Sequence, residues 1–365
     1  MHLPAEPMPI QEAFAWTAQR AVLKPQPTHV DPADKFIIRS SYQKAVRRGQ
    51  VERAVDMALA LHRIDSRYVW RAILTVALED VGLGSPDAVW FATHAQSSVF
   101  RRAVGELPLL IALTREMASS IKSRAACELS FVVDTGEPEI FRHFATMTTE
   151  HLLRRFAADD LYEAYAAISV LRGVVPTGYR ARQPDPAGIL AAIEIMDDQA
   201  SGRTAQAAKS ALRRPLDNMA MGYVVLSRLT VDPDHLELLQ DQPPESVLIR
   251  GYPSEAYDQH ERTGRRAIRA FGSRLLQSQP ELSGLLRQSF FAALADAVFV
   301  VEGQALDRWI ADAPMARLRH EADVFTLSRH GLRPDQAAVL TGAVRDCVDD
   351  LNACRLSAAL ENTAG

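Results

Sequence analysis

The chain has 365 residues, of which 47% are hydrophobic and 24% are charged, and its formal net charge is −4. This length and composition are typical of a globular protein with a substantial core, organised as one large domain or two. A protein that binds nucleic acid non-specifically usually carries a basic excess, so any basic surface on this chain must be local.

Other features argue against a membrane or secreted protein. The chain contains no stretch of about 18 uncharged apolar residues that could cross a membrane, and its first residues lack the basic and apolar regions of a secretory signal. The three cysteines, Cys127, Cys347 and Cys354, form no CxxC motif. That pattern is typical of a reducing compartment. We therefore expect a cytoplasmic protein without disulfides or a structural zinc site.

Apolar residues recur at spacings of three and four along most of the chain, which predicts an all-α fold. Ser85-Pro86-Asp87 is typical of a helix start, with a serine N-cap, a proline at the first helical position and an acid in the first turn. The expected helices cover about 10–22, 32–48, 50–63, 66–81, 86–96, 107–128, 138–156, 158–173, 187–199, 203–213, 216–229, 254–277, 280–300, 303–311, 315–329 and 334–360.

Two segments interrupt this helical pattern. Residues 174–188 contain three prolines and two glycines and show no periodicity. Residues 230–253 mix strand and turn signals, and the sequence ESVLIRGY within them favours a short strand that has no obvious partner. We expect two helical lobes, residues 1–175 and 187–365, joined by a linker at about 176–186.

The stretch ILTVALEDVGLGSPDAV, residues 73–89, predicts a fixed corner between two helices. Glu79 and Asp80 fall at the C-terminus of an apolar helix, where the helix dipole disfavours a carboxylate by up to ~1 kcal/mol. We therefore expect both acids to have partners, either arginines or the free N–H groups of the next helix. Gly82 fits the left-handed position after a helix end, and Gly84 permits a tight reversal.

The sequence around this corner resembles a known family. Residues 40–89 are similar to the helical C-terminal region of the replication-associated recombination protein A family, which are AAA+ ATPases related to clamp loaders and to the Werner-helicase-interacting protein. The matching positions are Lys44, Arg47, Arg48, Gly49, Glu52, Ala54, Arg71, Glu79, Asp80, Gly82 and Pro86.

This resemblance implies a clamp-loader-collar-like helical region that assembles into oligomers, in a protein that acts in DNA replication or repair. It does not extend to ATP hydrolysis, because the chain has no GxxxxGK[ST] phosphate-binding loop and only about 40 residues precede the match. We expect a non-catalytic accessory or regulatory protein without a cofactor. Its expected partners are DNA, a replication or repair protein, and further copies of the chain.

A second distinctive stretch, residues 251–274, predicts a basic helix face. On a helix that starts at Ser254, Asp258 and three arginines would share one face. Such a row could bind phosphates, or it could be a solvated face whose arginines pair with Asp258 and Glu261. The candidate binding residues of this stretch are Tyr257, His260, Arg262, Arg265, Arg266 and Arg269.

Lys44, Arg47, Arg48 and Arg53 form a second basic group beside Gly49, and the first three of them are candidate binding residues. Cations at a helix C-terminus face the negative end of the dipole, so a structural role explains them. The alternative is that they join the arginines of residues 262–274 in one electropositive patch that binds DNA or a protein.

Two functions of other classes stay open. Tyr257, Asp258, His260 and Arg262 include the residue types for proton transfer, which makes a helical enzyme the first alternative. No nucleophile or metal-ligand motif such as GxSxG or HExxH accompanies them, and we expect no metal site. The second alternative is a purely structural interaction module, which predicts exposed arginines that are paired with acids.

Overall fold

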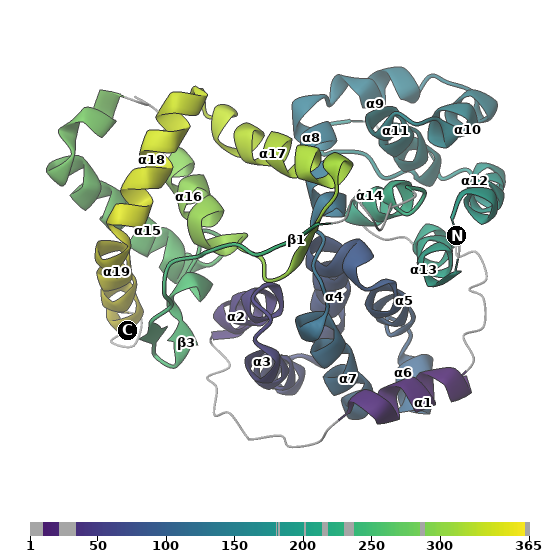
Figure 1. The fold of residues 1–365 in the computed structure, drawn as a ribbon, viewed down its shortest axis with the longest axis horizontal. Coiled ribbons are helices and arrows are strands. Elements are labelled where there is room, and N and C mark those ends of the chain that lie inside the picture. The colour runs from purple at the N-terminus through teal and green to yellow at the C-terminus, as the bar shows by residue number, and fades with distance from the viewer. Residues whose placement is uncertain are drawn as a thin grey trace. The chain divides into compact units, whose positions relative to one another are not determined.

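The computed structural model describes residues 10–21, 34–179, 181, 183–200, 202–213, 218–229, 237–284 and 289–361. Helices form nearly all of the regular structure in these ranges, accompanied by a few short strands (Figure 1). The prediction of an all-α fold is confirmed. Among the residues described, no helix is both long and apolar enough to cross a membrane.

The chain divides into two compact units, and each is assembled from three segments. Unit 1 comprises Met1–Lys24, Trp70–Leu239 and Arg308–Ala322. Unit 2 comprises Pro25–Val69, Gln240–Asp307 and Asp323–Gly365. This division differs from the two continuous lobes predicted from the sequence, because both units take residues from both halves of the chain.

Unit 1 is a multi-helix assembly whose centre includes α8 (Ala125–Gly136), α11 (Leu161–Arg172) and α14 (Asn218–Leu226), which contact one another. Most residues of α11 and α14 are buried, as expected of central helices that are apolar on all sides. The other elements of unit 1 are α1 (Ile10–Arg20), α5 (Pro86–His94), α6 (Ser98–Val104), α7 (Glu106–Ser119), α9 (Glu139–Phe144), α10 (Thr149–Ala157), α12 (Pro186–Gln199), α13 (Gly202–Arg213), β1 (Glu237–Leu239), β4 (Trp309–Ala311), a π-helical turn (Ala77–Val81), a 3₁₀ turn (Gly82–Gly84), most of α4 (Ser66–Val76) and the first part of α17 (Ala313–Ser328).

The predicted linker, residues 176–186, lies inside unit 1 between α11 and α12. The backbone N–H of Asp185 donates to the carbonyl of Leu171 at 2.9 Å, and the Asp185 carboxylate caps α12 by accepting from the N–H of Gly188 at 3.0 Å. The prolines and glycines of this segment therefore form a connection attached to the bundle. Residues 180 and 182 of the predicted linker lie outside the described residues.

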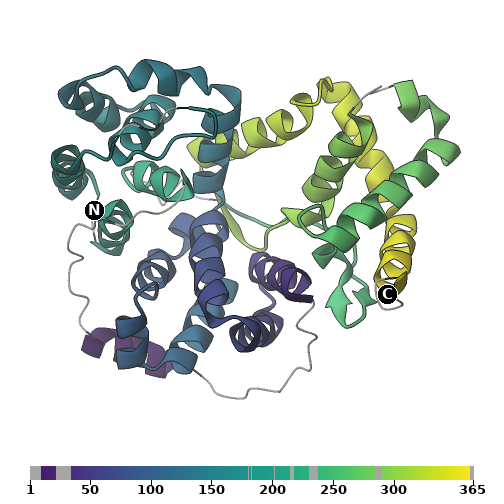
Figure 2. The same ribbon diagram turned by 180° about the vertical axis from the view of Figure 1, so that it is seen from behind.

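Unit 2 has a core between α15 (Arg262–Ser278), α16 (Phe290–Val298), α18 (Pro334–Asp346) and α19 (Val348–Glu361). Figure 2 shows α15 and α19 side by side, and their contact is extensive. The remaining elements of unit 2 are α2 (Lys35–Arg47), α3 (Val51–Ile64), β2 (Leu248–Ile249), β3 (Tyr252–Pro253), two short 3₁₀ turns (Ser254–Ala256 and Pro280–Gly284), a π-helical turn (Phe299–Gly303), and the ends of α4 and α17.

The helix predicted for residues 303–311 is wrong. Trp309–Ala311 forms β4, which pairs antiparallel with β1 and places Trp309 opposite Leu239. The backbone of Lys122 also bonds to this segment, donating to the carbonyl of Arg308 and accepting from the N–H of Ile310, both at 3.0 Å. The same pairing explains why the helix predicted for residues 107–128 breaks between α7 and α8.

The predicted strand within ESVLIRGY has a partner close by in the chain. β2 pairs antiparallel with β3 across the two-residue turn Arg250-Gly251. Both turn residues have positive φ, 52° for Arg250 and 84° for Gly251. This is the backbone that matches the twist of a tight hairpin, in which glycine is favoured.

Candidate nucleic-acid interface

The basic helix of unit 2 starts later than predicted. α15 begins at Arg262, not at Ser254, and Glu261 is its N-cap, accepting from the N–H of Thr263 at 2.6 Å and from that of Gly264. Residues 254–256 form a separate 3₁₀ turn. Asp258 therefore does not share a helix face with the arginines.

Gly264 explains how this start is possible. A Cβ atom at this position would lie 2.1 Å from the carbonyl oxygen of Asp258, well inside van der Waals contact. The loop that carries Tyr257 and Asp258 consequently packs directly on the first turn of α15. A residue with a side chain at position 264 would prevent this contact.

Three arginines of α15 remain on the surface. Arg262, Arg265 and Arg269 are exposed and lie on one side of the helix, opposite the buried Ile268 and Phe271. Within the described part of the chain, none of the three forms an ion pair, although Arg265 donates to the carbonyl of Gln259 at 3.3 Å. The helix pairs that would have neutralised this face do not form, since Asp258 and Glu261 have other partners.

Arg266 differs from these three arginines. It is half-buried and forms a salt bridge with Glu361 at the end of α19. Its charge is therefore compensated on the side of α15 that faces α19. Of the four α15 arginines predicted to bind a ligand, three are available and one is engaged.

The second basic group is not a surface. Lys44 is 3% exposed and forms a buried salt bridge with Asp258, which is 4% exposed. Ser40 completes this cluster, accepting from Lys44 at 2.7 Å and donating to Asp258 at 3.0 Å. The prediction that Lys44 contributes to an electropositive patch is wrong, because its ammonium is needed to compensate a buried carboxylate.

The electrostatics of the pair follow from burial and proximity. Burial lowers the pKa of Lys44, against the opposing effect of Asp258. Burial by itself would raise the pKa of Asp258, but the charges of Lys44 and His260 and the hydrogen bonds from both residues together outweigh it and place this pKa at about 2. Asp258 is therefore ionised at neutral pH and is an ion-pair partner, not a proton donor.

Arg47 and Arg48 are also committed to the interior of unit 2. Arg47 is 2% exposed, donates to the carbonyl of Gly303 and lies over the ring of Phe299. Arg48 forms a salt bridge with Glu255 and donates to the carbonyl of Glu302 at 3.0 Å. Both guanidinium groups therefore act as structural donors, which corrects their assignment to a binding patch.

Sequence reasoning missed Arg355, the most buried charge of this region. It is 0% exposed, and its guanidinium binds both carboxylate oxygens of Glu302, at 2.7 and 3.2 Å. Its Nε donates to the carbonyl of Tyr257 at 3.1 Å, so α19 is tied to the loop before α15. No sequence signal separates such an arginine from an exposed one, because arginine on a helix is usually solvated.

Tyr257 and His260 have different environments. Tyr257 is 1% exposed, and its hydroxyl donates to the carbonyl of Ile249 at 3.0 Å, with burial raising its pKa. His260 is exposed, with its ring edge-on to that of Phe299. Tyr257 and Asp258, two residues of the enzyme alternative, are thus both buried and bonded to other protein groups.

The corner in unit 1 has the arginine partner that the sequence predicted. Asp80 is 0% exposed, and Arg124 donates to it at 2.7 Å and to Glu79 at 3.2 Å. The two acids lie on a π-helical turn, Ala77–Val81, which extends α4. The arginine compensates carboxylates that the helix dipole would otherwise disfavour.

The two glycines of the corner are required for close packing. Gly82 has φ 48° and ψ −128°, a backbone conformation that glycine favours but not the left-handed helical one that the sequence predicted. A Cβ atom at Gly84 would lie 2.1 Å from the carbonyl oxygen of Ile121. α5 then starts as predicted, with the hydroxyl of Ser85 accepting from the N–H of Ala88 at 3.2 Å. The corner is therefore a structural element of unit 1.

Comparison with known proteins gives no assignment: no family model, no curated protein and no solved structure matches the chain. Nor do the residues that the structure describes contain a cluster of three or more His, Cys, Asp or Glu side chains placed to hold a metal ion. The geometry of the sites is thus the basis for a functional proposal.

Proposed function

We propose that the protein acts by binding and not by catalysis, and that the row of Arg262, Arg265 and Arg269 on α15 binds the phosphate backbone of DNA. The observation that carries this proposal is the absence of an ion-pair partner for these three arginines in the described part of the chain. An exposed cation that no carboxylate compensates is free to exchange its counterion for a phosphate.

The anchoring of α15 supports the same proposal. The helix is capped by Glu261 at its start and packs along α19. Its buried face consists of Ala267, Ile268, Phe271 and Leu275. A rigid helix holds the backbone of its exposed arginines at fixed spacing, so binding restricts only the conformational freedom of the arginine side chains themselves.

A role in DNA replication or repair, next to a partner protein or further copies of the chain, is the wider proposal. It rests on the resemblance of residues 40–89 to the recombination-protein family. Lys44, Arg47 and Arg48, which carry part of that resemblance, have structural roles in unit 2. The DNA contact is therefore proposed for α15 and not for the matching segment.

The proposal is tested by reversing two arginine charges on α15 and comparing this variant with a control variant of the same net charge. We expect Arg262→Glu with Arg265→Glu to abolish binding to single- and double-stranded DNA in a fluorescence anisotropy titration. The control is Arg142→Glu with Arg154→Glu, since both arginines are exposed and already paired with acids on their own helices. Equal loss in both double variants would show that net charge alone governs binding, and the α15 row would be abandoned.

Salt dependence supplies a second, quantitative test. Three phosphate contacts predict a slope of about −2.7 for log K against log salt on double-stranded DNA, or a loss of about 40-fold between 50 and 200 mM salt. Measuring the mass of the protein in solution in parallel tests the proposed self-assembly. No binding at ~50 mM salt would leave the purely structural interaction module as the better proposal.

A further inference from the structure

Unit 2 presents an exposed phenylalanine on the first turn of α2. Phe36 is 61% exposed, whereas every other residue of this helix is buried or half-buried. Its ring is nearly perpendicular to that of Tyr68, on the first turn of α4, and the two ring centroids lie 6.5 Å apart. Tyr68 can cover one face of the Phe36 ring at most, so a side chain this exposed keeps a flat apolar face open to solvent.

Tyr68 is held in place beside this ring. The Lys35 ammonium lies 4.2 Å from the centroid of the Tyr68 ring and 2.6 Å from the carboxylate of Asp65. The other oxygen of Asp65 accepts from the backbone N–H of Tyr68 at 2.9 Å. Lys35 and Asp65 compensate each other's charge, and together they fix the tyrosine against which Phe36 rests.

Two arginines next to the aromatic pair lack such compensation. Arg39 lies three positions after Phe36, so the two side chains are neighbours on the surface of α2. Arg67 precedes Tyr68 and is exposed. In the ranges that the structure describes, neither arginine forms an ion pair. An open aromatic face next to uncompensated cations is the combination with which proteins bind single-stranded nucleic acid.

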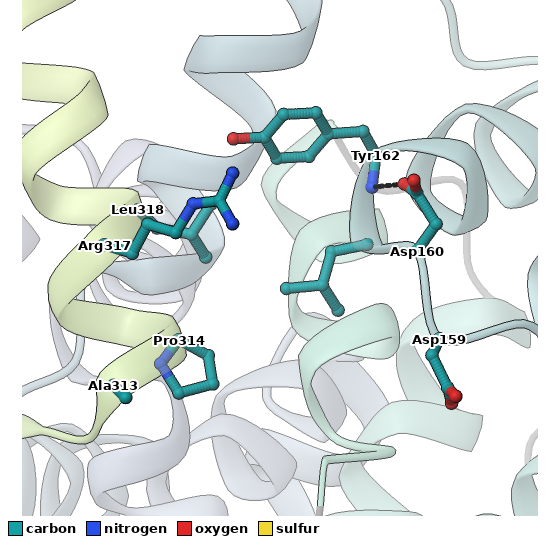
Figure 3. A pocket seen from close by; sticks show the side chains of 8 residues that line it. Asp159, Asp160, Tyr162, Ala313, Pro314, Arg317 and Leu318 are labelled. Carbon is teal, nitrogen blue, oxygen red and sulfur yellow. Dashed lines mark hydrogen bonds between the residues drawn. The ribbon is translucent and has the colours of Figure 1, made fainter.

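A tyrosine and an arginine also meet in unit 1, but there acids surround them. In a pocket of about 450 Å³ between the start of α11 and the first turns of α17, the Arg317 side chain extends below the ring of Tyr162 (Figure 3). Glu321 accepts hydrogen bonds from both side chains, at 2.7 Å from Arg317. Asp159 and Asp160 also line the pocket. These carboxylates would repel a phosphate, so an aromatic ring beside an arginine is not sufficient for a nucleic-acid site.

We infer that Phe36 stacks on an unpaired base of DNA and so adds a contact that only single-stranded DNA can make. This inference rests on the proposed DNA binding and adds to it the form of DNA that the protein prefers. In a duplex the bases stack on one another, and a surface side chain reaches their edges and not their faces. A single strand can place a base on the Phe36 ring while its phosphates bind Arg39 and Arg67.

The test is a fluorescence anisotropy titration of the full-length protein with three ligands of equal length at equal salt. They are oligothymidylate, a DNA duplex, and an abasic strand that keeps the phosphates and lacks the bases. We expect oligothymidylate to bind most tightly. Phe36→Ala should weaken its binding at least about fivefold, the lower end for the loss of one stacked base, and leave the other two ligands unaffected. Phe36→Trp, which keeps an aromatic face, should bind oligothymidylate at least as tightly as the parent.

Phe14→Ala is the matched control. Phe14 lies on α1 and is 60% exposed, close to the value for Phe36. The two charged residues of its helix are both paired, Glu12 with Arg203 and Arg20 with Glu116. Removal of this ring should therefore leave the binding of all three ligands unchanged.

The outcomes separate this inference from the arginine row of α15. Unchanged oligothymidylate binding in Phe36→Ala, or an equal loss on all three ligands, would overturn the stacking contact. If Arg262→Glu with Arg265→Glu abolished binding in the same series, the row would still stand. Conversely, a loss confined to oligothymidylate in Phe36→Ala, with normal binding by the α15 double variant, would support the stack and remove the row. Failure of all three ligands to bind at ~50 mM salt would overturn both.

Discussion

Removing the buried cation Lys44 should destabilise unit 2 far more than removing an exposed cation. In Lys44→Met, Asp258 keeps two neutral hydrogen bonds, from Ser40 at 3.0 Å and from the N–H of His260 at 2.8 Å. Breaking a buried ion pair on one side costs about 3–5 kcal/mol. Because these two donors still solvate part of the carboxylate, we expect a loss near the lower end of this range, about 3 kcal/mol.

A double-mutant cycle separates the pair from the packing around it. Asp258→Leu alone should cost a similar amount, while Lys44→Met with Asp258→Leu should recover most of the loss, since well-packed apolar replacements of buried pairs are often nearly neutral. The coupling free energy between Lys44 and Asp258 should therefore be favourable and exceed about 2 kcal/mol.

The assay is urea unfolding followed by far-UV circular dichroism. Tryptophan fluorescence, recorded in parallel, reports unit 1 alone, because all four tryptophans of the chain lie in that unit. A cost below about 1 kcal/mol for both single variants, with no coupling, would refute the buried pair. DNA binding by folded Lys44→Met should equal that of the parent, since we assign this lysine no phosphate contact.

Three further predictions concern unit stability. Asp80→Ala should lower the free energy of unfolding by about 3 kcal/mol and Glu79→Ala by about 1 kcal/mol or less, because only Asp80 is fully buried against Arg124. Equal losses of both variants in unfolding followed by tryptophan fluorescence would contradict this. Gly84→Ala should cost about 2 kcal/mol or more from its clash with a carbonyl oxygen, whereas Gly342→Ala, which has open space on α18, should be neutral or stabilising by about 0.5–1 kcal/mol. The pKa of Asp258 is about 2 in the folded protein against 3.8 for an ordinary aspartate, so its ionisation contributes about 2 kcal/mol to the free energy of unfolding above pH 4. This contribution is lost as the pH falls toward 2. Asp258→Asn should lack it, which urea unfolding midpoints measured from pH 5 to pH 2 would show.

Local patterns were sufficient to predict the helical class and the corner at Glu79 and Asp80. Both depend on residues that are close in the chain, such as the serine cap at Ser85 and the two glycines before it. The division into units depends instead on distant contacts. Residues 25–69 belong to the same unit as residues 240–307 and 323–365. A change in composition along the chain cannot reveal which of these distant segments pack together.

The candidate site was predicted in part for the same reason. The exposure of Arg262, Arg265 and Arg269 follows from the helical period, since the apolar residues between them define the buried face of α15. The helical period does not predict where α15 starts. Asp258 lies outside the helix because it pairs with Lys44, 214 positions away in the chain. Sequence spacing therefore suggested a local pair for an acid whose partner lies on another helix.

The same contacts explain how a chain of net charge −4 can expose a basic row. Three acids of unit 2, Asp258, Glu255 and Glu302, are buried in one-to-one pairs with Lys44, Arg48 and Arg355, so none of these acids is left to pair with the arginines of α15. Were these acids on the outer face of α15, they would compensate its arginines. The basic character of this row thus depends on where the acids lie more than on the number of basic residues. If α15 binds DNA as proposed, a variant that placed an acid on its outer face would weaken binding without changing an arginine.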